Sequence, residues 1–386
     1  MLAKVRIQNF KCLRDVTVDL GPFTVLIGPN DSGKSSFLDA LLLVNDTARR
    51  PWQEVLQGPA AFGHVVWKRD PRVPVILELT SSSGPDPFDY RLLLTGDRKP
   101  PLDRLSVGNS VLAELSQGNG GTYRRLIGSE AKNSQDPSFT ALGCVLRQHT
   151  PAEALPAARL LSSMSKHRFS PQDLRKPAKL TANPKLSESG DNLAAVLDAL
   201  ISGPDRSAIN ALEDALRREV PSLKGLSLET VVSGNDTLKE LHYALAGNER
   251  PPITVSARSV SEGALLLTAF PALVYGETAE LLMIEEPENG LHPERLATVI
   301  DLLRRISTGA ITGRPRQVVI TTHNPVLLNH VEPREVRVFQ RDPQNGTFVK
   351  NLADAPDIDK LSKNFATGEL WYMLGEKKLF EPEPTS

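Results

Sequence analysis

Short apolar runs that end in glycine or acidic and polar residues are the clearest pattern along this chain. Three of them occupy residues 23–27 (FTVLI), 281–284 (LLMI) and 317–322 (QVVITT). Runs of this length without polar alternation are typical of strands buried on both faces of a parallel sheet. Residues 36–44 (SFLDALLLV) instead predict a buried helix shortly after the first run. The pattern therefore predicts an α/β fold.

Alternation of polar and apolar residues predicts an additional, antiparallel sheet near the N-terminus. Residues 1–6 (MLAKVR) alternate from the start, which predicts a strand rather than a signal peptide. Residues 75–80 and 90–95 predict a hairpin that continues this sheet, because a turn-rich segment joins them. Further elements are expected as helices at 191–201 and 206–220 and strands at 226–232 and 238–245.

The pattern changes at about residue 97, where Pro and Gly begin to interrupt it, and the regular apolar runs return only after residue 254. We therefore expect residues 97–254 to form an inserted lobe within one larger domain. That domain would be built from residues 1–96 and 255–386.

Composition narrows the class of protein. The chain has 386 residues and a net charge of −1, so no global positive field points to nucleic acid. Its only cysteines, Cys12 and Cys144, exclude a disulfide scaffold and suit a reducing cytosol. The longest apolar stretch, residues 264–275, is broken by Pro271 and is too short to span a bilayer. A cytoplasmic protein without a membrane partner is expected.

One stretch is locally basic. Between residues 159 and 185 seven cations occur with a single acid, Asp173. The cations are Arg159, Lys166, Arg168, Arg175, Lys176, Lys179 and Lys185. Such a stretch could follow a DNA backbone, dock an acidic partner or form an ordinary solvated face, and all three interpretations stay open.

The segment 28–36 (GPNDSGKSS) predicts phosphate binding, because it fits G-x-x-x-x-G-K-[ST] at every fixed position. A strand precedes it and a helix follows, so backbone N–H groups can form an anion-binding nest at the helix N-terminus. Lys34 would reach the β- and γ-phosphates of ATP, and the Ser35 hydroxyl would bind Mg²⁺. The expected nucleotide-binding residues are Gly28, Pro29, Asn30, Asp31, Ser32, Gly33, Lys34, Ser35 and Ser36.

Three further segments place candidate catalytic or binding residues at the ends of strands or helices. Glu285 and Glu286 follow the run at 281–284, where the first would hold Mg²⁺ through water and the second would polarise the attacking water. His323 follows the run at 317–322, and parallel strands present their carboxyl ends at one edge of a sheet. Residues 261–263 (SEG) open an apolar helix, which makes them either an anion-seeking N-terminus or an ordinary N-cap.

Together these segments resemble the ABC-type ATPases outside the transporters, and especially the RecF-like and OLD-like bacterial ATPases. The resemblance is carried by residues 5–13 (VRIQNFKCL), 284–293 (IEEPENGLHP) and, in the lobe, 190–197 (GDNLAAVL). It implies a P-loop NTPase fold of the ABC type, with a mixed sheet, an antiparallel N-terminal subdomain and an inserted lobe of helices and strands.

The resemblance also implies the role of each candidate residue. Lys34 and Ser35 would be the Walker A residues, Glu285 and Glu286 the Walker B pair, and His323 the switch histidine that senses the γ-phosphate. Ser261, Glu262 and Gly263 would form a signature loop that contacts the ATP held by a second chain. A homodimer or higher homo-oligomer that sandwiches ATP and Mg²⁺ is therefore implied.

Some positions depart from the family pattern. Asp31 stands where glycine is usual, Ala264 replaces a second signature glycine, and Glu285 replaces aspartate. The glutamine that the family places at the lobe has only Gln148 as a candidate. Nuclease relatives carry a metal-binding acidic domain after the switch histidine; only 63 residues (386 − 323) follow His323 here, so no nuclease domain is expected.

The main functional hypothesis is a dimerising, Mg²⁺-dependent ATPase that drives or gates a partner, either an effector protein or DNA. The alternative is a slow, ATP-gated sensor or scaffold that holds a toxin or nuclease effector inactive in antiphage defence. A transporter subunit ranks third, because no docking loop for a membrane protein is evident.

Overall fold

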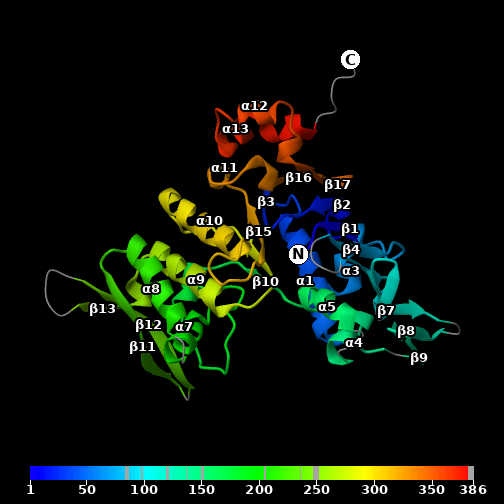
Figure 1. The fold of residues 1–386 in the computed structure, drawn as a ribbon, viewed down its shortest axis with the longest axis horizontal. Coiled ribbons are helices and arrows are strands. Elements are labelled where there is room, and N and C mark those ends of the chain that lie inside the picture. The colour runs from blue at the N-terminus through cyan, green and yellow to red at the C-terminus, as the bar shows by residue number, and fades with distance from the viewer. Residues whose placement is uncertain are drawn as a thin grey trace. The chain divides into compact units, whose positions relative to one another are not determined.

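The chain forms two compact units in the computed structural model (Figure 1). Unit 1 consists of Met1–Ser165, Ala279–Met283 and Arg316–Ser386, and unit 2 of Lys166–Thr278 and Ile284–Pro315. The structure describes all residues except 83–86, 97–98, 119–120, 136, 149–151, 204–205, 235, 247–251 and 381–386. Each unit is thus assembled from segments that lie far apart in sequence.

The N-terminal part of unit 1 is an eight-stranded antiparallel sheet with the order β2-β1-β4-β5-β6-β7-β8-β9. Its strands are β1 (Lys4–Phe10), β2 (Leu13–Asp19), β4 (Val75–Ser81), β5 (Phe88–Leu94), β6 (Leu102–Val107), β7 (Ser110–Gln117), β8 (Tyr123–Ile127) and β9 (Glu130–Ser134). Side chains of β4 and β5 alternate between buried and more exposed positions. One face of the sheet therefore packs on the core, as the alternating pattern predicted.

The second sheet has the order β10-β14-β15-β3-β16-β17, and its residues belong to unit 1 except the last two of β10 and of β14, which belong to unit 2. Its strands are β10 (Met164–His167), β14 (Leu281–Glu285), β15 (Gln317–Thr322), β3 (Phe23–Ile27), β16 (Val336–Asp342) and β17 (Gly346–Asn351). β3 lies between β15 and β16 and is parallel to both, whereas β17 is antiparallel to β16 (Figure 1). β3, β14 and β15 are buried at every position, which explains their unbroken apolar runs.

Helix α1 (Lys34–Arg49) follows β3 and shares one core with both sheets. Its buried side chains include Phe37, Leu38, Leu41 and Val44. The same core contains residues of β1, β4 and β5, of α4 (Ala141–Gln148) and α5 (Leu155–Leu161), and of β14 and β15. The helix that carries the phosphate loop is therefore anchored along its length by apolar packing.

Further helices, most of them short, complete unit 1. They are α2 (Trp52–Val55), η1 (Gly58–Ala60), α3 (Phe62–Val65), η2 (Trp67–Arg69), η4 (Ala152–Ala154), α11 (Pro325–Leu328), η6 (Pro333–Glu335), η7 (Leu352–Asp354), α12 (Ile358–Leu361) and α13 (Thr367–Phe380).

Unit 2 combines helices with a three-stranded antiparallel sheet of order β11-β12-β13. Its elements are α6 (Pro171–Leu174), α7 (Leu193–Ser202), α8 (Ser207–Glu219), β11 (Leu223–Ser233), β12 (Asp236–Leu245), β13 (Ile253–Ser256), η5 (Ala257–Ser259), α9 (Glu262–Gly276) and α10 (Pro293–Ser307). Helix α9 is buried almost all round, and the Tyr243 hydroxyl of β12 hydrogen-bonds the Thr268 hydroxyl of α9 at 2.9 Å. The expected helices and strands of the lobe are confirmed within a few residues.

The start of the lobe differs from the expectation at residue 97. Strands β6 to β9, within residues 102–134, extend the N-terminal sheet, and the second unit begins only at Lys166. The physical reason is that each new strand adds main-chain hydrogen bonds to the edge of the sheet, even where polar residues and glycine turns hide the alternation. Within the described residues, no helix is long and apolar enough to cross a membrane.

Candidate functional site

The phosphate loop of unit 1 connects β3 to α1, as the sequence predicted. Gly33 is the N-cap of α1 and has a φ of 107°, and no side chain caps the first turn. The first turn contains no acidic residue. The backbone N–H groups at this end of α1 are therefore presented to an anion without competition from a capping carboxylate or hydroxyl.

Two glycines of this loop are required by their surroundings. A Cβ atom on Gly28 would lie 2.1 Å from the carbonyl oxygen of Phe339 in β16. A Cβ on Gly33 would lie 2.6 Å from the Thr347 hydroxyl of β17. Both distances are shorter than any non-bonded contact, so larger residues would displace the loop or the neighbouring strands.

The Lys34 ammonium is held inside the loop. Its Nζ donates to the carbonyl oxygens of Gly28 at 2.7 Å and Pro29 at 2.8 Å and to the Ser32 hydroxyl at 3.2 Å. Lys34 is only 7% exposed. A buried cation stabilised by neutral oxygens is well placed to exchange those partners for phosphate oxygens, which carry charge.

Side chains from β16 and β17 support the loop from outside, and sequence reasoning missed them. The Thr347 hydroxyl donates to the Ser32 carbonyl at 2.8 Å, and Arg341 Nη1 donates to the Asp31 carbonyl at 3.4 Å. Asp31, which replaces the usual glycine, has a φ of 63° and an exposed side chain. These contacts join residues more than 300 positions apart, and no pattern in the sequence predicts them.

His323 is exposed and lies directly after β15. In the parallel register Thr322 pairs with Ile27, the last residue of β3. His323 and Gly28 are thus the next residues of two neighbouring strands, at the same end of the sheet. The structure brings the predicted switch histidine and the phosphate loop together within unit 1.

The two acidic residues after β14 have different environments. Glu285 is the last residue of the strand and is buried, and its Oε1 has no hydrogen-bond partner in the described part of the chain. Glu286 has a φ of 49°, which is unusual for a residue with a Cβ and costs on the order of 1 kcal/mol. A buried carboxylate oxygen without a donor suits a hydrated cation, and a strained residue beside it is typical of a functional position.

Two donors in unit 2 hold the Glu286 carboxylate. Arg168 Nη2 donates to its Oε2 at 3.1 Å, and Asn289 Nδ2 donates to the same oxygen at 2.7 Å. Sequence reasoning noted Arg168 only as part of a basic stretch and Asn289 only as part of a motif. No spacing rule links residue 168 to residue 286, so only the fold could reveal this pair.

The expected signature loop opens helix α9 in unit 2. The Ser261 hydroxyl is the N-cap and accepts a hydrogen bond from the Ala264 N–H at 3.4 Å. Ser261 and Glu262 are exposed, and a Cβ on Gly263 would meet no atom within 4 Å. Arg175 supports the loop, because it donates to the Val260 carbonyl at 3.1 Å and lies 3.8 Å from the Glu262 carboxylate. Ser261 is therefore an N-cap, and the surface at this helix start is also open.

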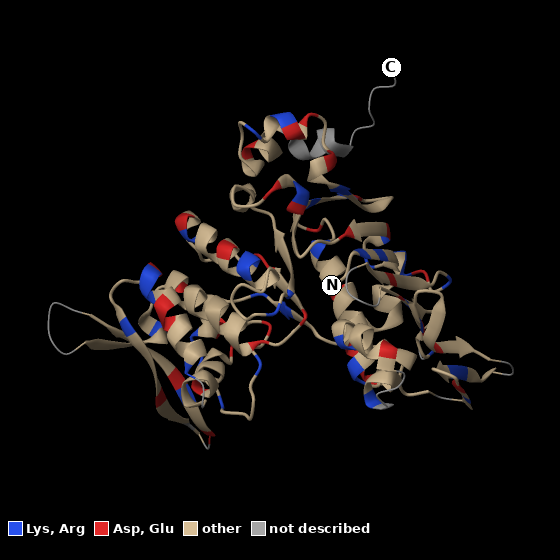
Figure 2. Ribbon diagram, viewed as in Figure 1, with Lys and Arg blue, Asp and Glu red and all other residues tan. Residues whose placement is uncertain are grey.

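The basic stretch is largely paired with acids of the same unit. Six of its seven cations form ion pairs: Lys166 with Glu188, Arg168 with Glu286, Arg175 with Glu262, Lys176 with Asp173, Lys179 with Asp236, and Lys185 with Glu277. Figure 2 shows Lys and Arg interspersed with Asp and Glu in unit 2. The stretch thus serves internal pairing, which weakens the argument for a continuous DNA-binding face.

The predicted site residues are divided between the two units, and we call the two sets the nucleotide half-site and the hydrolytic half-site. The nucleotide half-site, in unit 1, contains Lys34, Ser35 and His323, whereas the hydrolytic half-site, in unit 2, contains Glu285, Glu286 and residues 261–263. Gln148 is the last residue of α4, and its side chain lies outside the described part of the chain. Among the described residues, no group of three or more His, Cys, Asp or Glu side chains could hold a metal ion.

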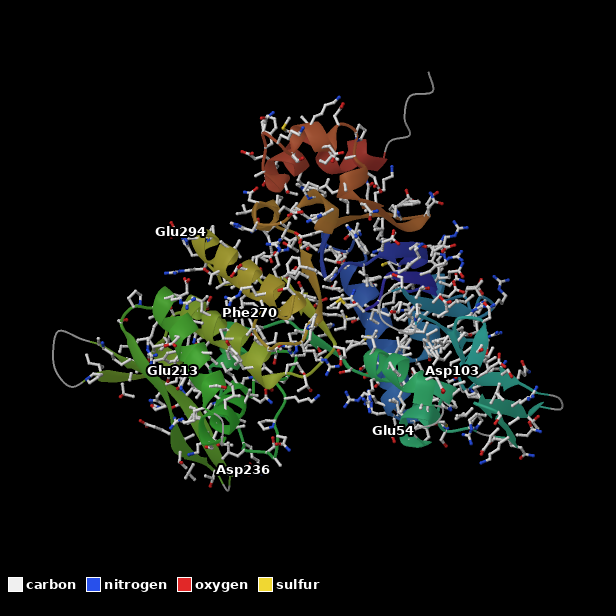
Figure 3. The ribbon with its side chains drawn as sticks, viewed as in Figure 1. Glu54, Asp103, Glu213, Asp236, Phe270 and Glu294 are labelled. Carbon is white, nitrogen blue, oxygen red and sulfur yellow. The ribbon has the colours of Figure 1, made fainter. Side chains whose placement is uncertain are left out.

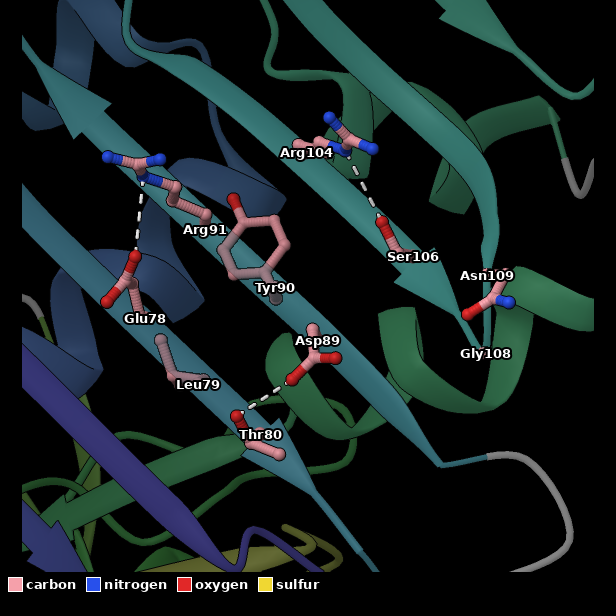
Figure 4. Close-up of a pocket in the computed structure, with 10 residues that line it drawn as sticks. All are labelled: Glu78, Leu79, Thr80, Asp89, Tyr90, Arg91, Arg104, Ser106, Gly108 and Asn109. Atoms are coloured by element: carbon pink, nitrogen blue, oxygen red, sulfur yellow. Dashed lines mark hydrogen bonds and ion pairs between the residues drawn. The ribbon is translucent and has the colours of Figure 1, made fainter.

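A separate hollow of about 640 Å³ lies on the N-terminal sheet and contains none of the predicted site residues. Its polar side chains largely pair with one another: Glu78 with Arg91, Thr80 with Asp89, and Arg104 with Ser106 (Figure 4). The hollow is therefore a self-satisfied surface of the sheet and not a rival nucleotide site.

Comparison with known proteins places this geometry in a family. Residues 23–329, more than half of the chain, match the family described as "AAA domain, putative AbiEii toxin, Type IV TA system". A relative named OLD nuclease, from Thermus scotoductus, is 24% identical over 380 residues, which cover 95% of this chain and 68% of that protein.

A solved structure shows the same fold. The Smc head bound to the C-terminal winged-helix domain of ScpA matches with a TM-score of 0.56 at 14% identity, covering 90% of this chain and 96% of that one. The SMC head domain from Thermotoga maritima matches with a TM-score of 0.48 at 12% identity, covering 91% and 98%. The predicted fold, an α/β P-loop architecture with a mixed sheet and an antiparallel sheet, is confirmed.

Proposed function

The chain belongs to this AAA domain family and carries an ABC-type ATPase domain, and from that premise we propose that it binds ATP with Mg²⁺ and hydrolyses it. The observation that carries the proposal is the phosphate loop. Its helix N-terminus is uncapped and its lysine is held inside the loop. Both features suit a triphosphate, because it offers charged oxygens to the ammonium and to the N–H groups.

Within the nucleotide half-site we assign one role to each residue. Lys34 exchanges its carbonyl partners for the β- and γ-phosphate oxygens, and the Ser35 hydroxyl holds Mg²⁺. His323, beside Gly28, senses the γ-phosphate. The remaining loop residues, Gly28 to Gly33 and Ser36, contribute backbone N–H groups and the shape of the nest.

Within the hydrolytic half-site the two acids divide the work. Glu285 would hold Mg²⁺ through a water, and that water would give its buried Oε1 a hydrogen-bond partner. Mg²⁺ bound there would neutralise the charge that develops on the transferred phosphate. Glu286 takes the proton from the attacking water, so the two acids are not interchangeable.

Dimerisation is part of the proposal, because the phosphate loop would cover only one side of the triphosphate and a second chain would cover the other. The exposed Ser261 and the open surface at Gly263 would bring the positive end of α9 to an ATP held by a second chain. We propose a homodimer or a higher homo-oligomer in the cytoplasm. Its cycle would drive or gate an effector protein, with DNA as a second candidate partner.

A second candidate function follows from the family description, which names a toxin of a type IV toxin–antitoxin system, and from the relative named OLD nuclease. In this alternative the chain is a slow, ATP-gated sensor or scaffold that restrains an effector in antiphage defence. A turnover number distinguishes the two, because a scaffold needs binding without rapid hydrolysis.

The test compares two substitutions with matched controls. Lys34→Ala should lose ATP binding, while Lys132→Ala, an exposed lysine of the β8–β9 hairpin, should not. Glu286→Gln should bind ATP but turn over at least about tenfold more slowly, a barrier increase of about 1.4 kcal/mol, while Glu294→Gln should behave as wild type. Normal turnover by Lys34→Ala would refute the assignment of the site.

A further inference from the structure

Glu286 is held at one carboxylate oxygen by two donors from different elements. Arg168 Nη2 lies 3.1 Å and Asn289 Nδ2 lies 2.7 Å from Oε2. The Glu286 side chain is 17% exposed and the Arg168 side chain is 60% exposed, so the acid is the more buried partner of the pair. Two donors that converge on one oxygen restrict both the χ angles and the plane of the carboxylate.

The backbone that carries Arg168 is rigid. Its N–H donates to the Glu188 carbonyl at 2.8 Å. Its neighbours His167 and Phe169 are 1% and 9% exposed. Phe169 packs edge-on against Phe270 of α9, with ring centroids 5.3 Å apart (Figure 3 labels Phe270). Because both neighbours are buried, the backbone position of Arg168 is fixed and its guanidinium points outward.

The neighbouring cations have other partners. Lys166, two residues earlier, pairs with Glu188, and Arg175 pairs with Glu262 and the Val260 carbonyl. Only the Arg168 pair, among these three, involves the acid that is proposed to take the proton from the attacking water. Arg168 thus combines a fixed backbone position with an ion pair to Glu286, the proposed base.

Resting on the function proposed above, we infer that Arg168 is a positioning residue for ATP hydrolysis. It holds the Glu286 carboxylate in one orientation, with Asn289 as the second support. A base that is held in place loses less activity to unproductive rotamers. Arg168 does not touch the nucleotide in this scheme.

The experiment measures kcat and KM for ATP in the full chain. Arg168→Ala should lower kcat by between about tenfold and a hundredfold, as expected when a catalytic group is misplaced, and leave KM within about twofold of wild type. Arg168→Lys should recover part of the loss, because it restores the charge without the planar donor. Lys166→Ala is the matched control, since it removes a cation two residues before Arg168, and it should retain the wild-type kcat.

A double-substitution cycle separates positioning from other roles. If Arg168 acts through the Glu286 carboxylate, Arg168→Ala should cause no further loss in the Glu286→Gln background. A further, additive loss there would overturn the inference. So would a raised KM with unchanged kcat, which indicates a nucleotide contact, or an increase in kcat, which indicates a restraint on the base.

The inference and the proposed function can fail separately. Absence of ATP hydrolysis by the wild-type chain would remove the proposed function itself. Hydrolysis by the wild type that is lost in Glu286→Gln but unaffected in Arg168→Ala would leave that function standing and refute only the role of Arg168.

Discussion

A buried carboxylate beneath the N-terminal sheet should make the stability of unit 1 depend on pH. Asp103 of β6 is 4% exposed and accepts hydrogen bonds from the N–H groups of Ala141 at 2.7 Å and Leu142 at 2.9 Å (Figure 3). It thereby fixes the start of α4. That helix supports α1, because Arg147 Nη2 donates to the Arg49 carbonyl at 2.7 Å.

Burial raises the pKa of Asp103 from 3.8 to about 6, since desolvation outweighs the two backbone hydrogen bonds that favour the ionised form. The folded state therefore binds a proton more readily than the unfolded state between these values. The stabilisation from this group is fully present below about pH 3.8 and is lost as the pH rises through 6. One pKa unit corresponds to about 1.4 kcal/mol, so the whole effect is about 3 kcal/mol.

The perturbation is Asp103→Asn, which cannot titrate. Between pH 7 and pH 5 the wild type should gain about 1.4 kcal/mol of unfolding free energy relative to this variant, because one pH unit of that interval lies below the folded pKa. Comparing two proteins at two pH values cancels the titration of all other groups. The control is Asp89→Asn, an exposed residue of the neighbouring strand β5.

The assay is urea unfolding followed by tryptophan fluorescence. The three tryptophans of the chain, Trp52, Trp67 and Trp371, all belong to unit 1, so the signal reports the unit that contains Asp103. A stability difference that is the same at pH 5 and pH 7 would refute the reasoning. It would mean that the two backbone N–H groups compensate the desolvation of the carboxylate.

Three further predictions concern the candidate site. Gly28→Ala should abolish ATP binding measured by calorimetry, because its Cβ would lie 2.1 Å from the Phe339 carbonyl oxygen; an unchanged affinity would contradict the steric argument. Glu285→Gln should shift the Mg²⁺ dependence of hydrolysis to higher concentration, and an unchanged titration would remove Glu285 from the metal site. ATP should promote dimerisation of Glu286→Gln in light scattering, and mixing Lys34→Ala with Ser261→Arg should restore activity that neither has alone. A fully active monomer with no rescue on mixing would exclude a signature loop that acts on a second chain.

The local elements of this protein follow from its sequence. Residues 23–27, 281–284 and 317–322 lie in strands because segments without polar alternation are typically buried on both faces, and the glycine loop after the first strand leads into a helix. These are short-range properties of the chain: spacing, propensity and turn chemistry act within a few residues. They were sufficient to predict the fold class and to nominate the phosphate loop, the acidic pair and His323.

What only the tertiary structure decided is which distant groups meet. The oxygens of Phe339 and Thr347 that exclude side chains at Gly28 and Gly33 lie in strands at the other end of the chain. The pairing of Arg168 with Glu286 likewise depends on how unit 2 folds. The sequence does not indicate which side chains will pair, because hydrogen bonds and ion pairs form through space between residues of common types. The sequence could therefore nominate the reacting groups, whereas their supports became visible only once folding had brought them within bonding distance.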